Sequence, residues 1–275
     1  MSSPAYVRPG QYALATGADA VGRLNVLHQI YSAAGREVLV EAGISKGMTV
    51  ADFGCGPGVV SRMLASLVGA SGSVTGIDFH AAQVEEARRL SAAEGVANTR
   101  FVAADACKTG LPGNQFDLLY CRFLLLHLTD PASCLREMRR VLKPGGILVV
   151  EDGDLASAGS VPPTALDSFA ELFCRLGPTR GVDYSIANRL WRLVGDAGFT
   201  VTNVKVHQPA ERAGLSGLLL KWSVEEAGPS FVGAGLITAD DLQRTVAEME
   251  SAVRDPEVLA LAPRMVLVSA KKRAS

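Results

Sequence analysis

The chain has 275 residues, and its 27 Lys and Arg against 28 Asp and Glu give a formal charge of -1 at pH 7. Apolar residues make up 48% of it, as in ordinary globular proteins. The balanced charge argues against a nucleic-acid binder, because recognition of a phosphate backbone needs an excess of Lys and Arg. No window approaches the roughly 18 consecutive apolar residues of a membrane span. Residues 1–10 lack the pattern of a secretory signal.

The five cysteines are scattered along the chain, and no two of them form a Cys-x-x-Cys pair. An odd, dispersed set favours reduced thiols over a disulfide framework or a zinc site. We therefore expect a cytoplasmic protein without a metal site, with one or two domains of about 100–200 residues each.

Apolar periodicity predicts alternating helices and strands over residues 1–152. An amphipathic helix is expected within residues 1–45, with its apolar stripe at Leu24, Leu27, Ile30 and Tyr31. Short apolar runs then predict strands at 48–53, 73–78, 99–104, 116–121 and 147–152, with helices at 59–68, 81–94 and 131–142 between them. Such alternation is typical of a parallel sheet with helices on both faces.

After residue 155 the alternation loosens. Helices are expected at 165–176 and 186–197, and strands at 199–206 and 264–270. Residues 209–257 predict a helical insertion, interrupted at Gly228-Pro229 and again at Gly233 to Gly235. The last two strands would then be the arms of a hairpin, with a helical cap inserted between them.

The most informative segment is residues 52–58, which read Asp-Phe-Gly-Cys-Gly-Pro-Gly. A glycine-rich turn between a strand and a helix lets the backbone approach a ligand and points the helix N-terminus at it. A dinucleotide fingerprint would read Gly-x-Gly-x-x-Gly or Ala, but the third glycine is Gly58, one residue early, and Val59 follows it. The spacing argues against NAD. A tight turn without a ligand is the alternative interpretation of the loop taken alone.

Acidic residues follow the next two predicted strands. Asp78 ends the second strand, where a carboxylate can accept hydrogen bonds from both hydroxyls of a ribose. Asp105 comes just after the third strand, where a carboxylate can accept from an adenine amino group. Taken singly, each acid is better explained as a helix cap or a solvated loop residue. Together with the glycine loop they predict an adenosine site at the carboxyl edge of the sheet.

Further short motifs extend this pattern along residues 48–152: Gly-Ile-Asp at 76–78, Ala-Asp-Ala at 104–106, Phe-Asp at 116–117, His-Leu-Thr-Asp-Pro at 127–131 and Leu-Lys-Pro-Gly-Gly at 142–146. In this order and spacing they resemble the class I S-adenosylmethionine-dependent methyltransferases, in the branch that mostly methylates small molecules. The resemblance implies an α/β, Rossmann-like fold with a seven-stranded, mostly parallel sheet, helices on both faces and one antiparallel strand near an edge. Residues 1–45 would form an N-terminal helical lid, and residues 46–275 the methyltransferase domain with its cap at about 209–257.

The resemblance also implies S-adenosylmethionine as cofactor and S-adenosylhomocysteine as product. The implied contacts are Gly54, Gly56 and the Cys121 backbone for the methionine part, Asp78 for the ribose, and Phe79, Asp105 and Ala106 for the adenine. The methionine carboxylate needs a donor, for which Tyr12 and Arg23 are the candidates; the alternative for Arg23 is a surface helix residue. The alternative for a reactive Cys121 thiol is a small buried residue at a strand end.

On the acceptor side, the resemblance makes His127 the candidate general base, because related small-molecule enzymes often place a histidine near the acceptor. Asp152, at the end of the fifth strand, would orient it or bind the substrate. The alternative for His127 is a histidine that caps or packs the following helix. Candidate acceptor contacts are His28, Tyr31, Arg122 and Asp154, with core packing as the alternative for the first two.

Departures from family patterns narrow the acceptor. Enzymes that methylate amino groups of bases carry a Pro-Pro-Tyr type of turn after the fourth strand, where residues 121–124 here read Cys-Arg-Phe-Leu. The metal-dependent catechol type needs an acid at that position. We therefore expect methyl transfer by in-line displacement to a small, fairly apolar metabolite, with no nucleic-acid partner and no metal. The alternatives are an S-adenosylmethionine-binding protein that does not methylate and a nicotinamide oxidoreductase.

Overall fold

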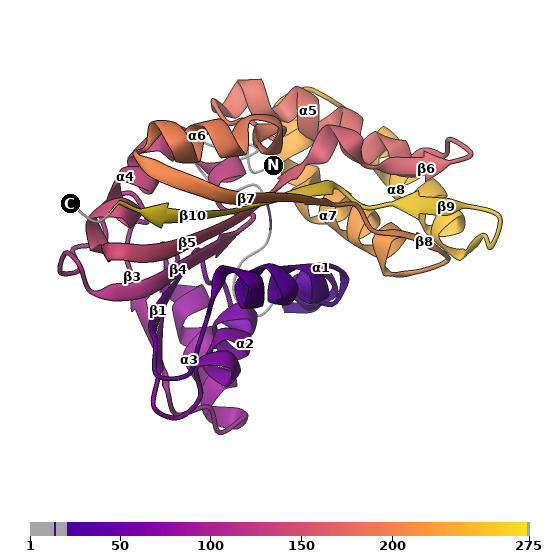
Figure 1. Ribbon diagram of the computed structural model, residues 1–275. Coiled ribbons are helices and arrows are strands. Elements are labelled where there is room, and N and C mark those ends of the chain that lie inside the picture. Colours follow the sequence, from indigo (N-terminus) through magenta and orange to yellow (C-terminus); the bar gives the residue numbers. More distant parts are fainter. Residues whose placement is uncertain (1–13, 15–20, 274–275) are drawn as a thin grey trace.

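The computed structural model describes Leu14 and residues 21–273, and its centre is a seven-stranded sheet in the order β3-β2-β1-β4-β5-β10-β7 (Figure 1). The strands are β1 (Thr49–Phe53), β2 (Ser73–Asp78), β3 (Thr99–Ala103), β4 (Phe116–Arg122), β5 (Leu142–Asp154), β7 (Phe199–His207) and β10 (Arg264–Lys272). Neighbours are parallel except at β10, which runs antiparallel to both β5 and β7. The predicted sheet, with one antiparallel strand near an edge, is confirmed.

Helices cover both faces of this sheet, as predicted (Figure 1). On one side lie α1 (Val21–Ala42), α2 (Val59–Val68) and α3 (Ala81–Ala93), and on the other α4 (Pro131–Val141), α5 (Ser168–Arg180) and α6 (Leu190–Asp196). Short 3-10 turns supplement them: η2 (Leu125–His127), η3 (Leu155–Ser157), η4 (Ala165–Asp167) and η5 (Ile186–Arg189). Each face has its own apolar core, so the sheet is buried on both sides.

Local signals explain where the helices begin and end. Pro131 opens α4, where its missing N–H costs nothing, and the Asp130 carboxylate accepts a hydrogen bond from the Ser133 amide at 2.9 Å. Gly181, with φ 70°, ends α5 in the left-handed region that favours glycine. These caps fix the loops that carry the residues at the carboxyl ends of the strands.

Helix α1 packs against α2 and the main sheet. Tyr31 and Leu39 are buried in the core between α1, α2 and the sheet. The predicted helix is therefore confirmed. Its role as a lid stays a prediction, because of residues 1–20 the structure describes Leu14 alone.

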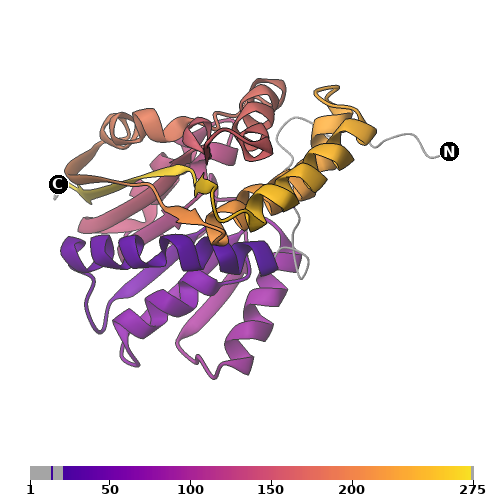
Figure 2. The same cartoon turned by 90° about the vertical axis from the view of Figure 1, so that its right-hand side faces the viewer.

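The segment between β7 and β10 forms the expected cap. It holds two helices, α7 (Leu215–Gly233) and α8 (Ala239–Arg254), and two short strands, β8 (Ala210–Arg212) and β9 (Leu259–Leu261). These strands join β6 (Gly159–Val161) in a three-stranded antiparallel sheet in the order β6-β9-β8. Figure 2 shows the orange and gold cap helices extending beyond the main sheet. The hairpin with an inserted cap is confirmed, but the small sheet was not predicted.

The predicted interruption at Gly228-Pro229 is wrong, because α7 runs unbroken through both residues and ends at Gly233. Close packing explains the glycine: a Cβ on Gly228 would lie 2.7 Å from Leu242 of α8. The neighbouring Phe231 is fully buried, so tertiary packing offsets the hydrogen bond that Pro229 cannot make.

No helix among the described residues is long and apolar enough to cross a membrane.

Candidate functional site

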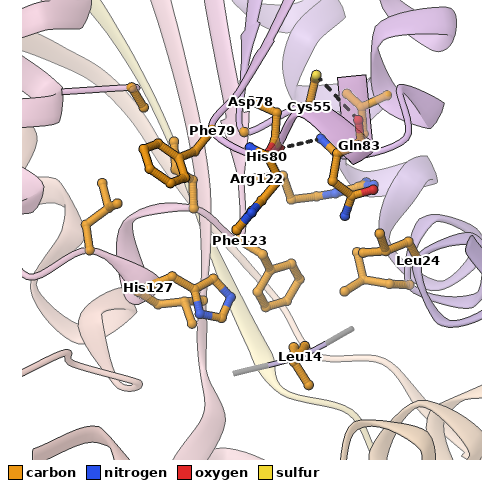
Figure 3. Close-up of a pocket in the computed structure, with 18 of the residues that line it drawn as sticks. Leu14, Leu24, Cys55, Asp78, Phe79, His80, Gln83, Arg122, Phe123 and His127 are labelled. Carbon is orange, nitrogen blue, oxygen red and sulfur yellow. Dashed lines mark hydrogen bonds between the residues drawn. The ribbon is translucent and has the colours of Figure 1, made fainter. Parts of the chain in front are cut away.

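A cavity of about 890 Å³ lies at the carboxyl ends of β1, β2 and β4, and the cap encloses its other side (Figure 3). Asp78, Cys55 and Gln83 lie together in one part of the view, and Phe123, Leu24 and Leu14 border the opposite part. The cavity therefore has a polar half at the strand ends and an apolar half toward the cap. Its volume is in the upper range of small-molecule sites.

The predicted glycine loop forms one wall. Gly54, Gly56 and Gly58 all have positive φ, at 72°, 51° and 77°, which favours glycine at each position. A Cβ on Gly58 would lie 3.0 Å from both Ala87 and Phe101, so α2 and α3 can approach closely. The loop thus lines the cavity with its backbone, and at Gly58 it leaves little room for a side chain.

Asp78 ties this loop to the end of β2. Its carboxylate accepts hydrogen bonds from the backbone amides of Gly56 and His80, each at 2.9 Å, and it lines the cavity. Phe79, the next residue, is 71% exposed although it is apolar. Asp105 accepts from the Cys107 amide at 2.8 Å, and Ala106 lies beside it in the lining. One exposed aromatic ring and two carboxylates thus line the same cavity.

The apolar half is built from segments far apart in sequence. Its lining comes from α1, from the turn after β4, and from α5 and α7: Leu24, Leu27, Phe123, Leu126, Phe169, Phe173 and Leu219. Polar atoms are few here; Ser223 of α7 and His127 of η2 are among those that reach the lining. This half suits an apolar molecule held by a small number of polar contacts.

His127 lines the cavity with its ring packed edge-on against Tyr184, at 5.8 Å between centroids. Burial, followed by the positive charges of Arg23 and Arg180, lowers the pKa of His127 to about 3. The imidazole is therefore neutral at pH 7.

Asp152 lies behind the turn that carries His127 and is absent from the lining. One of its oxygens accepts from the Leu125 amide at 2.8 Å, and the other from its neighbour Gly153 at 3.2 Å. Burial raises its pKa to about 7. The structure thus places Asp152 as a group that fixes η2, and gives it no direct contact with the cavity.

The two predicted arginines both reach the cavity. Arg23 of α1 forms an ion pair with Glu226 of α7 at 2.7 Å, so it links the sheet side to the cap. Arg122, the last residue of β4, contacts Nδ1 of His28 at 3.3 Å. His28 itself is not among the lining residues.

Other predicted site residues lie outside the lining. The Tyr31 hydroxyl donates to the Pro263 carbonyl at 2.7 Å, and Asp154 forms an ion pair with Arg264 at 2.6 Å. Cys121 is fully buried, and burial raises the pKa of its thiol. Tyr12 falls outside the described residues.

Several lining residues were missed, although the sequence carried a signal for some. Phe169 and Phe173 stand one helical turn apart in a helix that was predicted, and so do Leu219 and Ser223. Phe123 has φ 51° directly after β4, a backbone strain that no sequence pattern announces. Among the described residues no group of three His, Cys, Asp or Glu side chains could hold a metal ion.

Comparison with known proteins gives these features a family. A family model described as a methyltransferase domain matches residues 44–186, which is more than half of the chain. The chain belongs to this methyltransferase family. The family expected from the motifs of residues 48–152, the class I S-adenosylmethionine-dependent methyltransferases, is confirmed, together with its fold.

Curated relatives of this methyltransferase match less than half of the chain. The demethylmenaquinone methyltransferase of Staphylococcus aureus strain MRSA252 is 37% identical over 114 residues, which are 42% of this chain and 46% of that protein. The chain thus spans about half the length of the curated relatives it matches.

Solved structures repeat the architecture. A SAM dependent methyltransferase from Aquifex aeolicus is 28% identical with a TM-score of 0.50, over 62% of this chain and 81% of that one. The cyclase SpnF, at 22% identity and a TM-score of 0.53, matches 99% of this chain and 90% of its own. At that identity the likeness shows the fold alone, and the fold by itself does not decide the reaction.

Proposed function

We propose that this methyltransferase transfers the methyl group of S-adenosylmethionine to a small, fairly apolar metabolite by in-line displacement. The observation that carries the proposal is one continuous cavity, whose polar half suits an adenosine and whose apolar half suits the acceptor. Two ligands held in one cavity can meet in reactive alignment, which is worth roughly 7–11 kcal/mol of the barrier.

The residues present fit the cofactor. Asp78 would accept from the ribose hydroxyls, the exposed Phe79 ring would pack on the adenine, and Asp105 would accept from the adenine amino group beside the Ala106 amide. Gly54 and Gly56 would let the backbone lie against the methionine part. When bound, S-adenosylmethionine supplies a methyl group already activated on a sulfonium.

The chain's own part in the reaction is mainly to orient the acceptor and exclude water. The Phe169 and Phe173 rings and Leu126 form an apolar wall around the acceptor, while a ring nitrogen of the neutral His127 accepts a hydrogen bond from its hydroxyl or amine. This hydrogen bond directs the acceptor's lone pair toward the methyl group. His127 takes the acceptor's proton as the new bond forms and, because its pKa is low, passes that proton on to water. Asp152 keeps His127 in place through the Leu125 amide.

The proposal is tested by methyl transfer from labelled S-adenosylmethionine to a panel of phenols, quinols and apolar amines, with products identified by mass spectrometry. Replacing His127 with Ala should slow turnover by about 10²–10⁴-fold if the acceptor must lose a proton, and leave S-adenosylhomocysteine affinity unchanged. Because His127 is neutral above about pH 3, the wild-type rate should show no loss from its protonation between pH 8 and 5. A fall of the wild-type rate below about pH 6.5 that is absent in His127→Ala would contradict the proposal that His127 stays neutral in this range.

The alternative is a protein that binds S-adenosylmethionine without transferring its methyl group. The comparisons do not favour it, because the matched family and the curated relatives are methyltransferases. Tight binding of the cofactor without a methylated product across the whole panel would favour it. A cytoplasmic location is part of the proposal, supported by five cysteines that form no disulfide. A small-molecule acceptor in place of nucleic acid is supported by the missing Pro-Pro-Tyr turn.

A further inference from the structure

Arg122 brings a buried positive charge to the cavity wall. Its side chain is 8% exposed, and Nη1 is fully buried with no hydrogen-bond partner. Its one hydrogen bond among the described residues runs from Nη2 to Nδ1 of His28 at 3.3 Å, and there it forms no ion pair. A buried guanidinium without an anionic acceptor is unfavourable. The arrangement therefore indicates an anion that the polypeptide does not itself supply.

No carboxylate among the described residues forms an ion pair with the Arg122 side chain. Burial and then Arg122 lower the pKa of His28 to about 4, so this imidazole is neutral and can accept from the guanidinium. Asp52 and Glu151 are fully buried, and burial raises the pKa of each to about 7, so neither holds a full negative charge at neutral pH. Asp52 also accepts from the Ser61 hydroxyl at 2.6 Å.

The strand register places Arg122 beside the glycine loop. Phe53, the last residue of β1, pairs with Cys121 of β4, so Arg122 follows directly at the edge where the glycine loop begins with Gly54. Helix α1 bridges the same two points, because Leu24 lies 3.7 Å from where a Gly56 Cβ would be, and His28 follows one turn later. Arg122 thus belongs to the end of the cavity where the methionine part would lie.

We propose that Arg122 binds the carboxylate of the methionine part of S-adenosylmethionine, instead of the acceptor to which the sequence assigned it. The inference rests on the proposed function, since it presumes that cofactor. Arg23, the arginine that the sequence assigned to this carboxylate, already pairs with Glu226 of α7 at 2.7 Å. A planar guanidinium can hold a carboxylate through two parallel hydrogen bonds.

The test compares S-adenosylmethionine with decarboxylated S-adenosylmethionine, which lacks the carboxylate and keeps the ammonium and the sulfonium. Binding is measured by calorimetry without acceptor, on the wild type, Arg122→Gln and Arg23→Gln. The wild type should prefer S-adenosylmethionine by about 10–100-fold, and Arg122→Gln should reduce this preference to about threefold or less. In Arg23→Gln, the matched cavity arginine, the preference should persist.

The other outcomes separate the two proposals. If Arg122→Gln lowered the affinities for both ligands equally, the carboxylate contact would be overturned and Arg122 would have a structural role only. Loss of preference in Arg23→Gln alone would return the carboxylate to Arg23. Failure of the wild type to bind either ligand would instead overturn the proposed function. Should Arg122→Gln not fold, Arg122→Lys, which keeps the charge without the planar fork, should retain an intermediate preference; an unaltered preference would contradict the bidentate contact.

Discussion

The two halves of the cavity are built by different means. The cofactor half comes from three short loops at the ends of adjacent parallel strands, and its contacts are backbone groups and two acids, Asp78 and Asp105. The acceptor half comes from helices distant in sequence, such as α5 and α7, and its contacts are apolar side chains. The cofactor half therefore requires particular residue types at fixed, short spacings in the sequence. The acceptor half requires only side chains of suitable shape and polarity.

This difference predicts that a substitution in one half of the cavity leaves the function of the other half unchanged. The largest effect is expected at Phe173. Its ring is 1% exposed and packs on Phe169, Tyr184 and Phe231 at centroid distances of 4.8, 5.4 and 5.1 Å. Replacing Phe173 with Ala should lower the free energy of unfolding by about 3–5 kcal/mol, as measured by urea denaturation. Among the molecules that fold, affinity for S-adenosylhomocysteine should stay at the wild-type value.

Phe79→Ala is the matched control, since this aromatic ring borders the same cavity at 71% exposure. Loss of the ring should leave the free energy of unfolding within about 0.5 kcal/mol of the wild type. It should lower the affinity for S-adenosylhomocysteine. If Phe173→Ala lowered the affinity for S-adenosylhomocysteine as much as Phe79→Ala did, the division of the cavity into a cofactor half and an acceptor half would be wrong.

Asp78 probes the cofactor half in the same way. Its replacement by Ala removes the acceptor for the Gly56 and His80 amides together with the ribose contact. Affinity for S-adenosylhomocysteine should fall by about 2–4 kcal/mol in calorimetry. Asp105→Ala should cost less, because one amide, that of Cys107, depends on it within the described chain. If Asp78→Ala bound S-adenosylhomocysteine with unchanged affinity, Asp78 would not be the residue that binds the ribose.

What the sequence could predict follows the same division. Gly54, Gly56, Asp78 and Asp105 could be assigned to the cavity from a single chain, because each stands at or within a few residues of the end of a short apolar strand, and parallel strands end at one edge. The positions that depend on which face of an element points inward could not be assigned. Tyr31, for example, shares the apolar stripe of α1 with Leu27 but packs into the sheet.

The cap could be predicted only as a helical insertion. The three strands of the small sheet that it shares with β6 have three residues each, too few for a period of two to be recognised. The course of α7 through Gly228 and Pro229 depends on contact with Leu242, a residue from the next helix. Local propensity cannot contain such tertiary contacts.

The smallest predicted effect concerns Glu151, at the boundary between the halves. It stands level with Arg122 on the adjacent strand, and a Cβ on Gly35 of α1 would lie 2.7 Å from its Oε1. Burial raises its pKa from the ordinary 4.5 to about 7. The folded state therefore keeps a proton that the unfolded chain releases, and the resulting stability is complete below pH 4.5 and lost as the pH rises through about 7.

Glu151→Gln cannot lose that proton, so its free energy of unfolding relative to the wild type should rise by about 1–3 kcal/mol between pH 5 and pH 8. Asp52 and Asp152, also with pKa values raised to about 7, titrate in both proteins and cancel in the difference. Glu137→Gln is the control: Arg140, followed by Thr109, lowers the pKa of Glu137 to about 2, so its contribution is constant above pH 4.5. Urea denaturation at both pH values should therefore show a pH-dependent difference for Glu151→Gln and a pH-independent loss for Glu137→Gln. Equal behaviour of the two variants would mean that Glu151 is ionised against Arg122, whose charge would then not be available to a ligand.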